Sequence, residues 1–243
     1  MISPELNMSD YGDEDPANRL ERLGLPLLLL NRALIEARGA VLEHTSLDAP
    51  SASGMAAYSR VSRCLGEYFR SQEHPTYSRV VDHNQILFVS NRSDDEQFIF
   101  FRGNSSTGDR SSMPSSSCSK GPMTRRLVDT NKKMLGVSTY SLFPETLDTE
   151  IFPYGPITRV LLYDIRQDKS IRAELSIPVE YECQGDQIII TDWRDRIILP
   201  EIGPEGEVSQ QNPPDPDQFD FSIQRKACLL YWKIKNEQCE KTE

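Results

Sequence analysis

The first third of the chain carries apolar residues at the three- and four-residue spacing of amphipathic helices. A first helix is predicted over residues 20–41, and its regular part is expected to begin near Pro26, because proline fits a first turn but not a helix interior. A second helix is predicted over residues 54–71, after a loop rich in Ser, Asp and Pro. Its apolar face is expected to comprise Met55, Tyr58, Val61, Leu65, Tyr68 and Phe69. Both helices are expected to pack on a sheet.

Further along the chain, the pattern changes to that of short strands. Residues 85–90 and 97–102 are rich in β-branched and aromatic side chains and enclose a polar turn, which predicts a hairpin. Residues 171–177 show the clearest two-residue alternation in the chain. Other strands are predicted at residues 159–165, 187–192, 196–199 and 219–223. A terminal helix is predicted over residues 227–238.

Between the predicted hairpin and the later strands, large apolar side chains almost disappear. Residues 103–121 are full of Ser, Gly and Pro and are predicted to form a flexible loop that cannot pack a core of its own. A short helix is predicted over residues 122–135, because Pro122 suits a first helical position and Gly136 lies just past the end.

These elements predict an α+β fold, with a mostly antiparallel sheet, N-terminal helices packed on it and a Ser/Gly-rich loop before a short helix. Residues 1–17 are polar and acidic and are expected to be disordered. Residues 18–226 are expected to form a single domain that includes a Pro/Gly/Glu-rich linker over 201–217. Residues 227–243 would form a helical tail.

Composition narrows the class of protein. The chain of 243 residues has a formal net charge of -10, which argues against a general binder of nucleic acid. It has neither the ~18-residue apolar run of a membrane span nor the basic and apolar start of a signal peptide. We therefore expect a cytoplasmic protein without a membrane partner. The five cysteines are dispersed, which predicts reduced thiols rather than disulfides or a metal site.

One segment is basic, although the chain as a whole is acidic. Residues 102–133 carry seven basic and two acidic side chains, a difference of +5. Its centre is the sequence Ser-Lys-Gly-Pro-Met-Thr at residues 119–124, which opens onto the short predicted helix. The start of a helix presents unpaired N–H groups and a partial positive charge, so an anionic ligand, a nucleotide or nucleic acid is expected there. The candidate residues are Arg102, Arg110, Lys120, Gly121, Thr124, Arg125 and Arg126. The plain alternative is a flexible loop followed by a solvated helix start.

Other candidate chemistry is sparse. The chain contains no recognised nucleophile, zinc-protease or dinucleotide motif around its histidines His44, His74 and His83. Carboxylate pairs could form at Asp192 and Asp195 or at Asp164 and Asp168, and Asp220 with Lys226 is a further candidate by residue type. Such residues more often lie in turns or at the surface. Trp193 is expected in the core, whereas Trp232 is a candidate partner contact.

Several sequence segments together resemble a family of uncharacterised bacterial proteins. They are L-G-L-P at 23–26, S-T-G-D at 106–109, S-K-G-P-M-T at 119–124 with Asn131, R-A-E-L-S-I-P at 172–178, R-I-I-L-P at 196–200 and D-F-S-I-Q-R-K at 220–226. The resemblance spans roughly residues 19–228. It implies a bacterial origin and one coherent domain that includes the Ser-rich segment, but no activity.

Three functional hypotheses follow. The leading one is a non-catalytic binding or regulatory protein that contacts an anionic ligand or nucleic acid through the basic loop and helix. An alternative is a metal-dependent enzyme acting on a phosphorylated substrate, with Asp192 or Asp195 as a metal ligand or base. A third is a protein–protein interaction module that uses the acidic N-terminus and the helix around Trp232. The residues do not indicate a cofactor.

Overall fold

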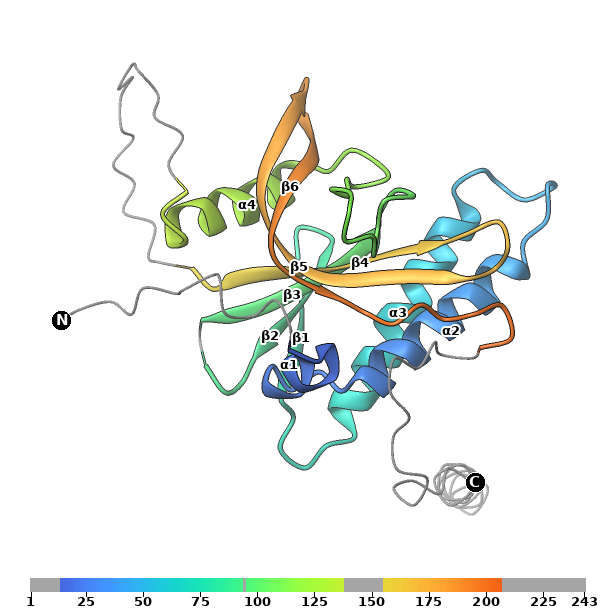
Figure 1. Ribbon diagram of the computed structural model, residues 1–243, viewed down its shortest axis with the longest axis horizontal. Helices are drawn as coiled ribbons and strands as arrows, with labels where there is room; N and C mark the ends of the chain where they lie inside the picture. Colours follow the sequence, from blue (N-terminus) through green and yellow to red (C-terminus); the bar gives the residue numbers. More distant parts are fainter. Residues whose placement is uncertain (1–13, 94, 138–154, 207–243) are drawn as a thin grey trace, which may run out of the picture. The chain divides into compact units, whose positions relative to one another are not determined.

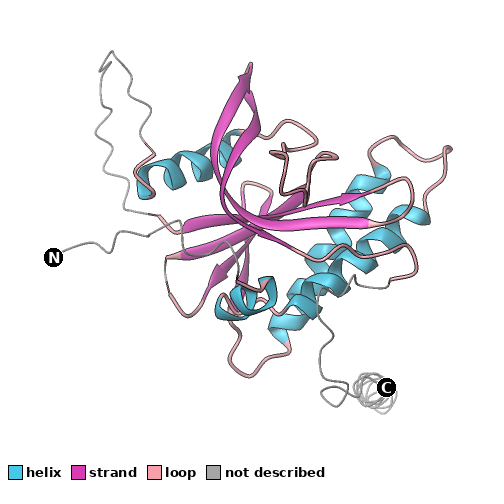
Figure 2. Ribbon diagram, viewed as in Figure 1, coloured by secondary structure: helices cyan, strands magenta, loops and turns pink. Residues whose placement is uncertain are grey.

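The computed structural model describes residues 14–93, 95–137 and 155–206, and these residues form the predicted α+β fold. A six-stranded, mostly antiparallel sheet carries helices on both of its faces (Figure 2). The strand predicted at 219–223, the helix predicted at 227–238 and the candidate contact Trp232 lie outside the described residues. Asp220 and Lys226 lie outside them as well.

Three helices precede the sheet, namely α1 (Pro16–Arg22), α2 (Leu27–Leu42) and α3 (Ala52–Arg70). The first predicted helix is divided because Gly24 has a positive φ of 71° and Pro26 follows as the N-cap of α2. A Cβ atom at Gly24 would lie 2.3 Å from the Thr76 side chain, so close packing also requires glycine here. α1 begins at Pro16, inside the segment predicted to be disordered, and the Asp15 side chain caps its first turn.

One face of α3 packs into the core, largely at the predicted positions. Val61, Leu65 and Phe69 are buried. The prediction for Met55 is wrong, because this side chain is 69% exposed. The buried positions of α3 begin only at Ala57, so the first turn of the helix stays in solvent.

The six strands lie in their sequence order across the sheet (Figure 1). They are β1 (Tyr77–Asp82), β2 (Gln85–Ser90), β3 (Glu96–Arg102), β4 (Ile157–Ile165), β5 (Ile171–Gln184) and β6 (Gln187–Ile198). Neighbouring strands are antiparallel except β3 and β4, which are parallel. A parallel pair needs a crossover connection, and here that connection contains α4 (Pro122–Met134).

β2, β3 and their hairpin confirm the prediction, whereas β1 was not predicted. Four of the six residues of β1 are exposed, so its apolar residues do not alternate. A two-residue turn joins β1 to β2, and its residues His83 and Asn84 both have positive φ, 45° and 64°. This is the type I′ geometry that matches the twist of a hairpin.

β5 and β6 are longer than predicted. The predicted end of a strand at residue 177 is wrong, because β5 continues through Pro178 to Gln184. The division of β6 into two strands is also wrong. A register shift in the β5–β6 pairing and a positive φ of 46° at Asp195 mark a bulge, which interrupts the alternation without ending the strand.

The side chain of Asn131 on α4 replaces the backbone pairing that Pro178 cannot make. Its Nδ2 donates to the carbonyl oxygens of Thr158 (2.9 Å) and Pro178 (3.0 Å). Its Oδ1 accepts from the N–H of Thr158 at 2.8 Å. Because Asn131 is fully buried, these bonds join α4, β4 and β5 inside the core.

The central strands of the sheet are buried on both faces. Phe98 and Phe100 of β3 pack with α1, α2 and α3, whereas Ile99 and Phe101 pack on the opposite face with Leu127 of α4. Figure 1 shows α2 and α3 on one side of the strands and α4 on the other. This double coverage explains why β3 is a continuous apolar run and not an alternating one.

The segment 103–121 was predicted to be a flexible loop, but the structure shows it bound to the sheet. Its backbone carbonyl groups are the acceptors. Trp193 donates from Nε1 to the carbonyl of Pro114 (2.8 Å), and Arg196 donates to the carbonyls of Ser112 and Asp109, both at 2.9 Å. The prediction considered apolar side chains only, whereas polar groups of β5 and β6 hold this loop.

A buried ion pair on β5 and β6 underlies that attachment. Glu174 is fully buried, and Arg196 donates to both of its carboxylate oxygens, at 3.1 and 2.6 Å. The Ser176 hydroxyl (2.8 Å) and the backbone N–H of Gly108 (3.0 Å) donate to the same carboxylate. The carboxylate is thus fully hydrogen-bonded, as a buried charge requires.

Candidate anion-binding site

The N-terminal end of α4 is formed by a tight local sequence. Lys120 is fixed to β6, because its N–H and C=O exchange hydrogen bonds with Ile188 at 2.7 and 3.0 Å. Gly121 is the N-cap in an extended conformation, and Pro122 occupies the first helical position. No side chain caps this end of the helix. Helix geometry therefore leaves the N–H groups of Met123 and Thr124 without an acceptor within α4.

An open pocket of about 300 Å³ lies at this end of α4. The β1–β2 turn forms its other side, so residues about 40 positions apart in sequence meet there. Its lining residues are His83, Asn84, Gln85, Gly121, Pro122, Met123, Thr124 and Arg126. The candidate residues Gly121, Thr124 and Arg126 are thus brought together.

Thr124 gives this pocket a specific polar feature. The residue is only 4% exposed overall, and it lines the pocket. A threonine hydroxyl carries one O–H donor, so it can hydrogen-bond an anionic oxygen directly. A ligand oxygen in the pocket can accept a hydrogen bond from this hydroxyl.

Two basic side chains line the same pocket. Arg126 is exposed on the first turns of α4. Across the pocket, the His83 ring Nδ1 lies 2.7 Å from the Asp82 carboxylate. With the uncapped helix start, the pocket offers backbone N–H, hydroxyl and guanidinium donors. Such a set of donors is suited to an anionic oxygen.

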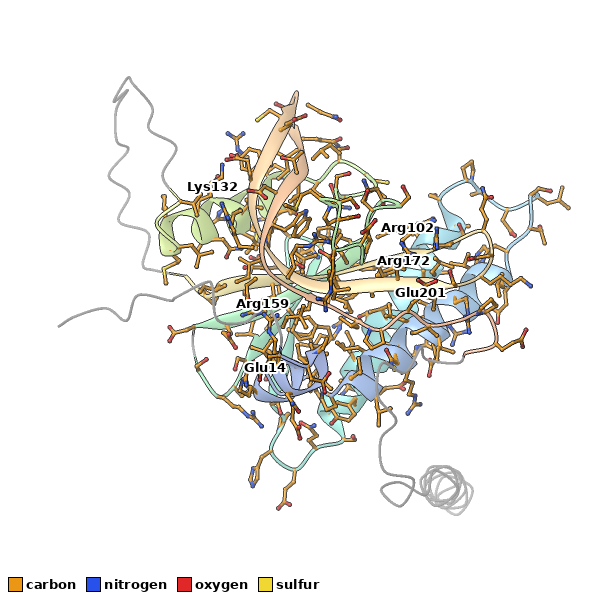
Figure 3. The ribbon with its side chains drawn as sticks, in the orientation of Figure 1. Glu14, Arg102, Lys132, Arg159, Arg172 and Glu201 are labelled. Atoms are coloured by element: carbon orange, nitrogen blue, oxygen red, sulfur yellow. The ribbon has the colours of Figure 1, made fainter. Side chains whose placement is uncertain are left out.

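The remaining candidate residues lie elsewhere. The Lys120 Nζ lies 4.3 Å from the centre of the Phe101 ring, and burial lowers the pKa of this amine. Arg125 donates from Nε to the Tyr181 hydroxyl at 3.1 Å, on a different side of α4. Arg110 is exposed on the loop. Arg102 lies 3.4 Å from the Asp164 carboxylate, and Figure 3 shows it well apart from Lys132 of α4.

The candidate carboxylate pairs have structural partners. Asp195 forms ion pairs with Arg19 and with Arg159, the latter at 2.7 Å. Asp192 accepts from the Trp193 N–H, and Asp168 accepts from Ser170 in a turn. No group of three or more His, Cys, Asp or Glu that could hold a metal ion is found among the residues the structure describes.

Sequence reasoning missed the contribution of the β1–β2 turn to the pocket. The signal available was the His-Asn pair before the strand at 85–90, since Asn tolerates positive φ in a two-residue turn. That signal alone does not place the turn beside α4. The proximity arises because β1 and β2 continue the sheet on which α4 packs.

The comparisons add no further information on this site. No family model, curated protein or solved structure matches the chain. Among the described residues, no helix is both long and apolar enough to cross a bilayer.

Proposed function

We propose that this protein is a binding or regulatory protein that holds a small anionic ligand, a phosphate or carboxylate group, in the pocket at the start of α4. The observation that carries the proposal is the Thr124 hydroxyl, whose residue lines a pocket beside an uncapped helix start. The helix start favours negative charge, and the hydroxyl supplies a directed donor.

The distribution of basic residues favours a small ligand over a nucleic-acid strand. Arg126 lines the pocket, whereas Arg125 contacts Tyr181 and Lys120 lies against Phe101. Arg102 belongs to the opposite end of the loop, beside Asp164. A polyanion needs a continuous basic surface, and these side chains do not line one groove.

The first test is thermal unfolding of the full chain with inorganic phosphate and a panel of nucleotides. A ligand that binds the folded state raises the melting temperature, and the rise grows with the logarithm of the ratio of ligand concentration to Kd. We expect a salt-sensitive rise with at least one phosphate-containing probe. The absence of any rise across the panel would contradict the proposal.

Paired variants locate the site. Arg126→Gln should weaken binding roughly 10- to 100-fold, since a hydrogen bond to a charged group contributes about 1.5–3 kcal/mol. Arg125→Gln is the matched control, because it removes the same charge one residue away, where the side chain contacts Tyr181. Thr124→Val removes only the hydroxyl and should also weaken binding. Equal effects of Arg126→Gln and Arg125→Gln would point to general electrostatics and not to this pocket.

A further inference from the structure

The outer edges of β1 and β6, the two edge strands of the sheet, differ in whether other residues hydrogen-bond to their backbone. At β6, the backbone of Lys120 pairs with Ile188, and the Ser116 hydroxyl accepts from the Ile190 N–H at 3.3 Å. At β1, no described residue pairs with the outer edge. An edge strand with unpaired N–H and C=O groups is a template for another strand.

The hairpin geometry determines which backbone groups of β1 face outward. The two-residue turn at 83–84 closes on the hydrogen-bonded pair Asp82–Gln85. Hydrogen-bonded and non-hydrogen-bonded pairs alternate along an antiparallel ladder, so every second residue of β1 bonds to β2. The bond from the Asn91 N–H to the Thr76 carbonyl (2.9 Å) agrees with this alternation, because Thr76 is also even-numbered. Even-numbered residues of β1 therefore bond to β2. The outward-facing residues are Tyr77, Arg79 and Val81.

Two apolar side chains of β1 are accessible at this edge. Val80 is 43% exposed and Val81 is 55% exposed, on opposite faces of the strand. Charged residues commonly protect such edges. The charge of Arg79 is instead drawn back over α3, where its Nε lies 3.4 Å from the Ser62 hydroxyl.

We propose that β1 pairs antiparallel with β1 of a second copy of this chain, about a two-fold axis at Val80. In an antiparallel pair, residues directly opposite each other have their side chains on the same face of the sheet. A two-fold axis normal to the sheet also keeps every side chain on its own face. The axis must therefore pass through a position where one residue lies opposite the same residue of the second copy. Centred on Val80, the pairing places Val80 against Val80, Arg79 against Val81 and Ser78 against Asp82 of the second copy. The central valines form a non-hydrogen-bonded pair, in which side chains approach most closely.

The neighbouring symmetric registers are less complementary. An axis at Arg79 places two arginines directly opposite each other, and like charges in that position are destabilising. An axis at Val81 places Asp82 against Val80, so the Ser78–Asp82 pairs of the Val80 register are lost. The Val80 register alone gives an apolar centre flanked by Ser–Asp pairs that can hydrogen-bond. This self-complementarity favours a second copy over an unrelated peptide as the occupant.

Sedimentation equilibrium of the full chain tests the pairing. We expect a reversible monomer–dimer equilibrium. Val80→Lys places two ammonium groups at the axis and should raise the dimer dissociation constant at least tenfold. Leu28→Lys is the matched control, because it makes the same kind of change at an exposed apolar position on α2 and should leave the constant unchanged. Circular dichroism confirms that each variant is folded.

A mixture of two variants tests the register itself. Val80→Lys and Val80→Glu chains should each be monomeric alone and should form a mixed dimer together, because opposite charges then meet at the axis. Amide exchange measured by NMR provides a readout without mutation, since the Arg79 and Val81 amides should become protected as protein concentration rises. A wild-type chain that remains monomeric with exchanging amides, or a dimer indifferent to Val80→Lys, would overturn the proposal. Failure of the mixture to associate would overturn the Val80 register.

Discussion

Asn131 shows how much a single side chain can determine in this protein. Its amide takes the place of a peptide unit where Pro178 interrupts the pairing of β4 with β5. The three hydrogen bonds are buried, so none can be replaced by water without opening the core. Asn131 therefore holds α4 to the sheet and, with it, the pocket at the other end of the helix.

We expect Asn131→Leu to lower the free energy of unfolding by about 2–5 kcal/mol, because it leaves the Thr158 N–H and two carbonyl groups buried without partners. Urea unfolding followed by circular dichroism measures this loss. Thr130→Ala is the control, since the Thr130 hydroxyl bonds only to the Arg126 carbonyl of its own helix. It should change stability by less than about 0.5 kcal/mol. Equal effects of the two changes would show that Asn131 is not the link described.

At the scale of elements, the loop 103–121 depends on the pair Glu174 and Arg196 of β5 and β6. Arg196 binds the carboxylate and two loop carbonyls at once. The loop leads directly to Lys120 and Gly121, so its attachment also fixes where α4 begins.

Arg196→Met should destabilise the fold by about 3–5 kcal/mol, because it leaves Glu174 as an unpaired buried charge. It should also expose the loop to trypsin at Arg110, which limited proteolysis detects. Arg194→Met is the matched control, as Arg194 is exposed and lies 4.0 Å from Asp192. Adding Glu174→Leu to Arg196→Met should recover part of the lost stability, and a further loss would contradict the proposed coupling.

At the scale of the whole molecule, one core cluster contains groups that resist ionisation. Burial raises the pKa of the Cys64 thiol to about 11 and those of the Tyr77 and Tyr163 hydroxyls to about 12. All three belong to the cluster between the N-terminal helices and the sheet. Each therefore favours the folded state only while it remains protonated.

The fold is expected to lose stability as pH rises from about 9 towards 12. A folded-state pKa above the unfolded value contributes stability that is complete below the unfolded pKa and is lost as pH rises through the folded one. Thermal unfolding at pH 8, 10 and 11 measures this decline. Tyr77→Phe should flatten it, although it removes the 2.7 Å bond to the Leu23 carbonyl. An unchanged melting temperature up to pH 11 would contradict the argument.

Apolar periodicity was sufficient to predict most elements of this fold. The helices at α3 and α4, the β2–β3 hairpin and the α+β class followed from spacing, proline positions and turn residues. The same reasoning failed at β1, whose residues are mostly exposed, and at Pro178, where a side chain from another element restores the pairing. A local sequence pattern indicates which positions are buried. It does not indicate which side chains from other elements form hydrogen bonds with the polar groups at those positions.

The candidate site also has one part that local sequence predicts and another part that only tertiary contacts place. Local sequence indicated the start of α4 and its residues Gly121, Thr124 and Arg126, since glycine, proline and helix geometry act over a few residues. The tertiary structure alone brought His83 to that pocket and turned Lys120 and Arg125 towards aromatic rings. Those placements depend on contacts between residues distant in the chain. A one-dimensional pattern carries charge and periodicity, whereas the packing of strands and helices decides which charges meet.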